Sequence, residues 1–349
     1  MKQILSTLIL LLTGQLLFSQ LGGQHSFEFL SLPSSARVTG LGGSIISVND
    51  DDLSLALHNP AVLDSTSHNF ISFNHHFHVA DISNGFFNYA RNLPWLGLTG
   101  HAGVQYVNYG DFTLADEIGN VSGSFDASDL ALVLGVARQM NERIRLGLNL
   151  KYINSSYESY SSSGLATDLG IYYENPESKF SAGIVVQHLG VQLSSFTDEK
   201  ESLPLDVQIG VSKKLEHLPF RFSITAHNLQ TLGIRYDDPN VAEVTDIFGT
   251  VQSSSRLEEG LDNFFRHFIF SGEFLLGKKE NLRLRFGYNH LRRKELKISE
   301  FQSIGGFSLG VGLKIYKFRI DYGVGYYHLG GNTNHLTITT NLQEFRKKI

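Results

Sequence analysis

The sequence has 349 residues, a formal net charge of −5 and no cysteine. The lack of Cys excludes disulfides, thiolate catalysis and lipid attachment through a cysteine, and the charge offers no polybasic surface for nucleic acid. Gly (34), Phe (25) and Tyr (14) are plentiful while Met (2) is scarce, which suits one large domain of β-strands with aromatic girdles.

The first residues have the pattern of a secretory signal peptide. Lys2 is followed by an apolar run from Leu8 to Phe18 and then by the small residue Ser19. A transmembrane helix is the alternative, but the run is shorter than the roughly 20 apolar residues that a span requires. We expect residues 1–19 to be removed. Because no later stretch is long and apolar enough to be a spanning helix, a membrane location would require a barrel.

Residues 20–68 precede every strand-like segment and do not themselves alternate. Gly42 and Gly43 supply backbone freedom for tight turns, while the run Asn49–Asp52 can cap a short helix over Leu53–Leu57. If the strands that follow close into a barrel, this segment is placed to plug its lumen. The residues expected to form the plug motif are Gly42, Gly43, Asp51, Asp52, Asn59, Pro60 and Ala61.

From residue 69 onward the hydrophobic pattern has a period of two. In the run from Arg143 to Tyr152, every second residue is apolar and the residues between them are mostly charged or polar. About fourteen such segments can be counted, an even number, and most exceed the roughly 9–11 residues of a tilted membrane strand. They lie near residues 69–79, 82–92, 95–109, 125–138, 142–154, 160–174, 178–192, 203–215, 219–232, 264–276, 281–292, 302–316, 317–329 and 334–346.

A soluble sandwich would show the same alternation, so the connections between strands decide between the two folds. Short connections such as Asn92–Pro94 and Glu216–Leu218 alternate with long ones such as Gly110–Ser124 and Gly233–Asn263. Outer-membrane barrels sort their loops in this way, with short periplasmic turns and longer outer loops. We therefore predict an all-β fold in which residues 69–349 form a transmembrane antiparallel β-barrel of about 14 strands.

The longest connection, Gly233–Asn263, is strongly acidic. It is either a docking surface for a partner or a merely solvated loop, and its unusual length favours a function. The spacing of Ser255 and Glu258 is that of a capping box, which predicts a short helix there. The candidate partner-docking residues are Asp237, Asp238, Glu243, Asp246, Glu258 and Glu259.

Basic side chains on the polar face of the strands are expected to point into the lumen. The set comprises Arg143, Arg145, Arg283 and Arg285. A structural role, in which they pair with carboxylates such as Glu273 and lock the plug, is favoured over anion binding or an ion path.

Neither a metal nor a catalytic site is expected. His76 and His78 share one face of a strand and His75 points to the other, so at most two of the three converge. The acidic run at Asp50 lacks the glycine and distal glutamate of an EF-hand loop, and the chain has no Gly-x-Ser-x-Gly elbow. We therefore expect no cofactor and no enzymatic activity. An outer-membrane hydrolase is a further alternative, which we do not favour. It would require a Ser and a His side chain within hydrogen-bonding reach of each other.

The N-terminal segment also carries a family resemblance. Leu41-Gly42-Gly43, the acidic pair at Asp51 and the tripeptide Asn59-Pro60-Ala61 resemble the opening of the FadL-like outer-membrane barrels, whose NPA segment lies in the lumen behind a small N-terminal hatch. The run Leu32–Arg37 and the His-Asn-Pro-Ala form at His58–Ala61 are more similar to the PorQ family of the type IX secretion system of Bacteroidetes.

This resemblance implies a non-enzymatic, integral protein of the bacterial outer membrane. PorQ-type barrels resemble anchors of an attachment complex that also contains the sortase PorU, the sister barrel PorV and the surface protein PorZ. The complex links secreted cargo to lipopolysaccharide, and a barrel of this type would hold a PorZ-like partner at the cell surface. The alternative is a FadL-like transporter of hydrophobic small molecules, which predicts an apolar pocket beside the plug and a strand that kinks inward.

Overall fold

The computed structural model describes residues 25–50, 52–78, 82–197, 199–235, 256–296, 304–328 and 331–346. Several predicted features lie outside the described residues, namely the signal peptide at 1–19, the plug residue Asp51 and the loop carboxylates Asp237, Asp238, Glu243 and Asp246.

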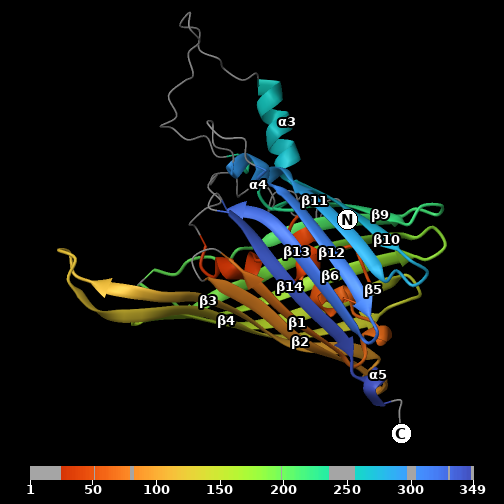
Figure 1. Ribbon diagram of the computed structural model, residues 1–349, viewed down its shortest axis with the longest axis horizontal. Helices are drawn as coiled ribbons and strands as arrows, with labels where there is room; N and C mark the ends of the chain where they lie inside the picture. The colour runs from red at the N-terminus through yellow and green to blue at the C-terminus, as the bar shows by residue number, and fades with distance from the viewer. Residues whose placement is uncertain are drawn as a thin grey trace, which may run out of the picture.

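Fourteen antiparallel strands form a closed barrel, as predicted (Figure 1). Each strand pairs with its neighbours in sequence, and β1 closes the ring against β14 with Phe70 opposite Asn341 and Phe77 opposite Asn334. The strands are β1 (Phe70–Phe77), β2 (Ser83–Leu93), β3 (Leu98–Ala115), β4 (Val121–Gln139), β5 (Ile144–Tyr157), β6 (Tyr160–Asn175), β7 (Phe180–Ser194), β8 (Asp206–Lys214), β9 (Phe220–Ala226), β10 (Phe268–Leu276), β11 (Leu282–Asn289), β12 (Phe307–Ile315), β13 (Phe318–His328) and β14 (Gly331–Asn341).

Short helices complete the structure and lie before, between and after the strands. They are η1 (Glu28–Ser31), α2 (Ala36–Gly40), η2 (Leu53–Leu57), η3 (Pro60–Val62), η4 (Ser65–Ser67), η5 (Pro94–Leu96), α3 (Arg256–Arg266), α4 (His290–Glu295) and α5 (Gln343–Arg346). No helix in the described ranges combines the length and the hydropathy needed to cross a bilayer.

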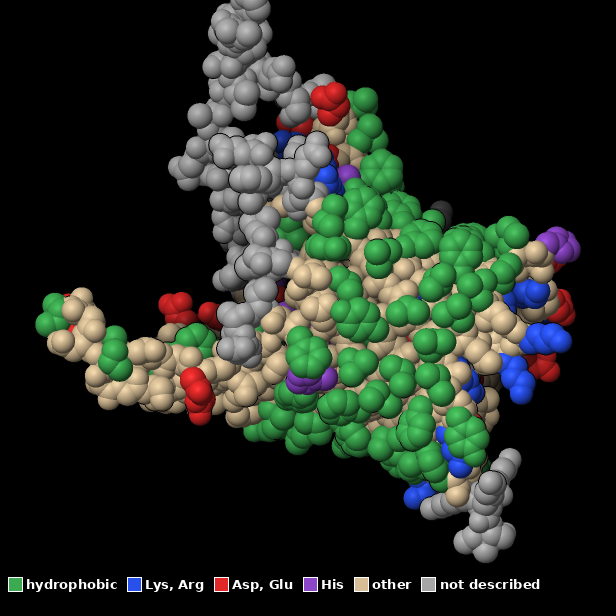
Figure 2. Space-filling model, viewed as in Figure 1, with side chains coloured by type: hydrophobic (Ala, Val, Ile, Leu, Met, Phe, Trp, Pro, Cys, Tyr) green, Lys and Arg blue, Asp and Glu red, His purple; other side chains and the backbone are tan. Residues whose placement is uncertain are grey.

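The two faces of the barrel wall follow the alternation of the sequence. On β5, Arg145, Asn149 and Lys151 are buried on the inner face, whereas Leu146 and Leu150 are 40% and 55% exposed on the outer face. The same arrangement recurs around the ring and gives the outside of the barrel a broad hydrophobic belt, visible in Figure 2. Polar residues inside and apolar residues outside are the reverse of a soluble sandwich and match a wall that faces lipid.

The two ends of the barrel differ, as the loop lengths predicted. Tight turns gather at the end that carries α5, whereas α3, α4 and the long β3–β4 hairpin lie at the other end (Figure 1). That hairpin corrects one expectation, because Gly110–Ser124 is not a loop: β3 and β4 continue to Ala115 and from Val121. Stacking of Phe112 on Phe125, with ring centroids 5.2 Å apart, helps to extend the pairing.

The strands beside the longest connection are shorter than predicted. β9 ends at Ala226 rather than near residue 232, and β10 begins at Phe268 rather than near residue 264. Residues 256–266 form α3 instead, which confirms the helix predicted from the capping-box spacing. Its proposed cap, Ser255, lies outside the described residues.

Candidate functional site

The N-terminal residues 25–63, apart from Asp51, lie inside the barrel and are called here the luminal segment (Figure 1). Its apolar side chains pack in four groups, of which two are the largest. One surrounds Val38 and Leu55 and includes Tyr172 of β6, while the other joins Phe27 and Phe29 to residues of β3, β4, β5 and β6. The segment is therefore packed against the wall rather than suspended in an open channel.

Two glycines of the plug motif turn the chain after α2. Gly42 and Gly43 adopt φ values of 94° and 103°, a left-handed region that favours glycine. Their N–H groups donate to the carbonyl oxygens of Thr39 and Val38 at 3.2 and 2.9 Å and so close the end of the helix. This reversal sends the chain back across the lumen.

The remaining motif residues cap the two short helices that follow. The Asp52 carboxylate accepts from the N–H of Ser54 at 3.1 Å and starts η2, the helix expected over Leu53–Leu57. The Asn59 side chain accepts from the N–H of Ala61 at 3.0 Å and donates to the carbonyl of Ile46 at 2.8 Å. With Pro60 at the first position of η3, these contacts tie two passes of the luminal segment together.

Glycines in the wall allow the luminal segment to approach the strand backbone. A Cβ on Gly147 of β5 would overlap the backbone nitrogen of Ala61, and one on Gly183 of β7 would overlap the carbonyl oxygen of Ile46. The same holds for a Cβ at three further luminal positions, Gly170, Gly287 and Gly323, against Asn59, Gly42 and Ala36 respectively. The sequence gives no sign of these close approaches, since a glycine in a strand pattern does not reveal what it touches.

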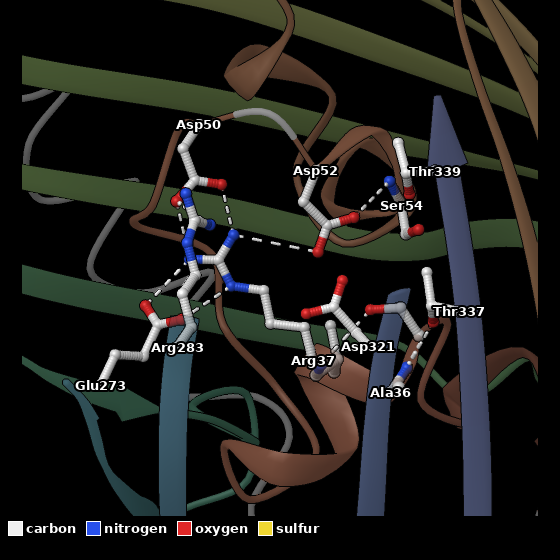
Figure 3. Close-up of polar contacts among 12 residues, drawn as sticks. Ala36, Arg37, Asp50, Asp52, Ser54, Glu273, Arg283, Asp321, Thr337 and Thr339 are labelled. Carbon is white, nitrogen blue, oxygen red and sulfur yellow. Dashed lines mark hydrogen bonds and ion pairs between the residues drawn. The ribbon is translucent and has the colours of Figure 1, made fainter. Parts of the chain in front are cut away.

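A buried cluster of charges joins the luminal segment to the strands (Figure 3). Arg37 of α2 is fully buried and forms a bidentate pair with Asp50 in the segment itself. It also binds Glu273 of β10 with Nε–Oε1 and Nη2–Oε2 distances of 3.1 and 2.9 Å. Asp52 lies 3.9 Å from the same guanidinium.

Strand arginines complete this cluster. Arg283 and Arg221 reach Asp50 at 3.1 and 3.2 Å, and Arg285 bridges Glu273 and Asp321. The cluster, here called the Arg37 cluster, contains four arginines, one lysine and five carboxylates among the described residues, so their formal charges balance. The set is Arg37, Lys214, Arg221, Arg283, Arg285, Asp50, Asp52, Glu273, Glu280 and Asp321.

The predicted luminal arginines have different fates. Arg283 and Arg285 belong to the Arg37 cluster, and Arg145 binds Asp64 at 2.8 Å and lies over the ring of Tyr172. Arg143 corrects the prediction, because it is exposed in the turn before β5. Strand β5 begins only at Ile144, one residue after Arg143, so the Arg143 side chain does not enter the lumen.

Further polar contacts attach the luminal segment to the rest of the ring. On one side the N–H of Ala36 donates to Thr337 of β14 at 2.8 Å, and on the other Ser44 donates to Gln208 of β8 at 2.7 Å. Leaving one partner of such a buried hydrogen bond unsatisfied costs about 1–3 kcal/mol. Pairs distributed around the ring therefore hold the segment in one position and favour the structural reading of the luminal charges.

One cavity of about 530 Å³ lies between the luminal segment and the wall toward the long-loop end. Leu30, Leu203, Leu205, Ile269 and Leu291 contribute apolar surface, and polar side chains lie among them. These include His58, Gln187, Gln208, His227, Asn228 and Arg292. A pocket of this mixed lining differs from the apolar pocket that the transporter alternative predicts.

Strand β7 carries an irregularity beside this cavity. Gln187 and His188 lie opposite the single residue Asp168, and both of these β7 side chains are buried, which is the mark of a β-bulge. Gln187 donates to the carbonyl of His58 at 2.6 Å, and Nδ1 of His188 lies 2.9 Å from the carbonyl of Pro204. The turned-in side chains are thus engaged with the protein interior.

The histidine group on β1 divides as the strand period requires. His76 is buried and stacks on His335 with ring centroids 4.5 Å apart, and the tilted ring of His78 lies 4.1 Å from it, whereas His75 contacts Tyr106 on the other face. Within the described ranges, no group of three or more His, Cys, Asp or Glu residues is arranged to hold a metal ion.

One Ser–His pair meets the distance requirement of the hydrolase alternative. His25 Nδ1 lies 2.7 Å from the Ser202 hydroxyl at the exposed end of the luminal segment. A catalytic pair also needs a group that orients the histidine. Among the described side chains, no carboxylate forms a hydrogen bond with His25.

Of the predicted docking loop, Glu258 and Glu259 fall within the described residues, on α3. The helix is held by Asp262, which contacts Lys294 and His290 of α4 at 2.7 and 3.1 Å and Arg266 at 2.9 Å. Burial alone would raise the pKa of Asp262, but the hydrogen bonds from Lys294, His290 and Arg266 hold it well below its usual range.

Comparison with known proteins supports the barrel. No family model matches the chain, and no curated protein matches it. The Pseudomonas putida toluene transporter TodX is 10% identical over 89% of this chain and 99% of its own, with a TM-score of 0.52. The CymD monoaromatic hydrocarbon channel is 12% identical over 89% and 96%, with a TM-score of 0.50.

The chain has the FadL-like barrel fold. At these identities the likeness establishes the architecture and leaves the function to be argued from the residues. The contacts of the luminal segment bear most directly on function, because they determine whether the barrel is open or filled.

Proposed function

We propose that this chain is a non-enzymatic barrel of the bacterial outer membrane, filled by its luminal segment and acting as an anchor for a protein at the cell surface. The observation that carries the proposal is the Arg37 cluster, in which Arg37 is fully buried between the segment and β10. The balanced charges of this cluster and the close contacts with wall glycines support a luminal segment that stays in place. A permanently filled lumen is compatible with a scaffold but not with a pore.

The partner is proposed from the sequence resemblance. In the PorQ family, the barrel would belong to the attachment complex of the type IX secretion system and would hold a PorZ-like surface protein beside PorU and PorV. Cargo would be linked there to lipopolysaccharide. The long-loop end offers the surface, since Glu258 and Glu259 lie on α3 at that end.

The experiment is affinity purification of the tagged protein from gently solubilised outer membranes, followed by mass spectrometry. Stoichiometric recovery of a PorZ-like surface protein with the wild type supports the proposal. Charge reversal of Glu258 and Glu259 to Lys is expected to reduce that recovery, while Glu142→Lys in a turn at the opposite end is the matched control. Recovery of the barrel alone from membranes that contain the candidate partner would contradict the proposal.

A second function is transport of hydrophobic small molecules. Two observations favour it. The chain shares its fold with the toluene transporter TodX and the CymD channel, and β7 carries a bulge whose side chains turn inward. The polar side chains around the cavity favour the anchor. Lipid analysis of the purified protein separates the two, because a transporter of this kind should retain an apolar ligand beside the luminal segment.

A further inference from the structure

Helix α3 exposes its apolar face. Leu257, Leu261 and Phe264 follow one another at spacings of four and three residues, which places them on one side of the helix, and Phe265 lies beside them. Leu257, Leu261, Phe264 and Phe265 have exposed fractions of 74%, 50%, 54% and 44%. In a soluble protein an amphipathic helix turns this face toward the core. Here it is turned away from the protein.

The polar face of α3 is the one that contacts the protein. Asn263 accepts from the N–H of Ile234 at 2.9 Å and donates to the carbonyl of Leu232 at 2.7 Å. Asp262 binds Lys294 of α4 at 2.7 Å. Rotating the helix to bury its leucines would break these contacts, so the polar bonds fix the outward direction of the apolar face.

The apolar face continues directly into the belt of the barrel. Only His267 separates α3 from β10, and the ring of Phe264 lies 4.9 Å from that of Phe268. Phe268 is followed by Phe270, at 6.2 Å, on the outer face of β10, while Ile269 between them is buried. Figure 2 shows hydrophobic side chains at α3 running into the hydrophobic surface of the barrel below.

We propose that α3 lies on the outer leaflet of the outer membrane with its apolar face among the acyl chains. This inference rests on the membrane location in the proposed function. An amphipathic helix at this position binds by burying its apolar side chains at the boundary between headgroups and acyl chains. Leu257, Leu261 and Phe264 take that role, with Glu258 at the border of the apolar face and Glu259 on the opposite side of the helix.

Continuity with the belt selects lipid over a protein as the occupant. Phe264 touches Phe268, which belongs to the surface that lipid covers. A protein that covered Phe264 would also have to displace lipid from the end of β10. Glu259 lies on the opposite side of α3 and its carboxylate is 3.4 Å from Arg235, so the membrane contact leaves that side of the helix uncovered by lipid.

The test uses spin labels on single cysteines, which the chain permits because it has no native Cys. Leu261→Cys and, as a second position, Leu257→Cys report on the apolar face, and Glu259→Cys is the control on the opposite face of the helix. Leu134→Cys on the outer face of β4 marks the membrane interior, and Ile118→Cys in the β3–β4 turn marks water. Each variant is placed in phosphatidylcholine–phosphatidylglycerol vesicles, and accessibility to oxygen and to a water-soluble nickel chelate is measured.

The labels at 261 and 257 are expected to resemble the one at 134, with high oxygen and low nickel accessibility, while the label at 259 has lower oxygen accessibility than those at 261 and 257. Nickel accessibility at 261 and 257 equal to that at 118 would overturn the inference. So would protection of these labels in native outer membranes but not in vesicles, which would show that a protein covers the face. Nickel accessibility at 134 would instead show that the barrel is not inserted, a failure of the proposed location.

Discussion

Replacement of Arg37 by methionine is expected to release the luminal segment while leaving the barrel intact. The substitution keeps most of the side-chain volume and removes the charge that Asp50 and Glu273 share. Asp50 keeps two strand arginines and Glu273 keeps Arg285, so the cost should fall at the low end of the range for a broken buried pair, about 3 kcal/mol. Since each 1.4 kcal/mol is a factor of ten, the open population rises roughly 100-fold.

The assay is maleimide labelling of a single cysteine at Ser47, which is fully buried in the luminal segment. Arg37→Met should raise the labelling rate by that factor, whereas the exposed Arg143→Met should leave it unchanged. Adding Asp50→Asn to Arg37→Met restores neutrality and should return part of the protection. Equal labelling of the two arginine variants would refute the reasoning. Loss of the folded barrel's heat-dependent gel migration in Arg37→Met would show that the cluster supports the wall instead.

Two further predictions concern the wall and the outer helix. Gly147→Ala should weaken docking of the luminal segment by about 1–3 kcal/mol, because the new methyl group overlaps the backbone of Ala61. The substitution should therefore raise the labelling rate of a cysteine at Ser47. Gly123→Ala is the control and should not raise it, because the space around Gly123 is open. The lowered pKa of Asp262 means that its contact with α4 stabilises α3 at neutral pH and is lost only as the pH falls through the depressed value. Spin-label mobility on α3 should therefore differ between the wild type and Asp262→Asn at pH 7 and pH 5, and the difference should diminish in stronger acid.

The strands were predictable because their signal is local. Alternation with a period of two depends on residues that are neighbours in sequence, and it located all fourteen strands and the inward Arg145, Arg283 and Arg285. It failed where the chain turns, as at Arg143, because the pattern of side chains continues by chance beyond the last paired residue. It also missed the extension of β3 and β4, whose pairing depends on the cross-strand contact of Phe112 with Phe125.

The contacts of the luminal segment could not be predicted from the sequence. Arg37 and Glu273 are 236 positions apart, and neither carries a motif that identifies the other. The role of the glycines opposite the segment could not be predicted either, because a glycine in a strand is also compatible with a bulge or a weak strand. Asn59 and Asp52 were found from local capping patterns, whereas the surfaces that they meet depend on closure of the ring.

The central claim is that the luminal segment fills the barrel, and conductance across a planar bilayer tests it most directly. The wild-type protein, with insertion verified by its flotation with lipid vesicles, should show no stepwise conductance, because the Arg37 cluster and the glycine-lined contacts hold the luminal segment across the channel. Arg37→Met should produce intermittent steps as the segment leaves. Steady conductance steps from the wild type would contradict a filled barrel and, with it, the anchoring function proposed here.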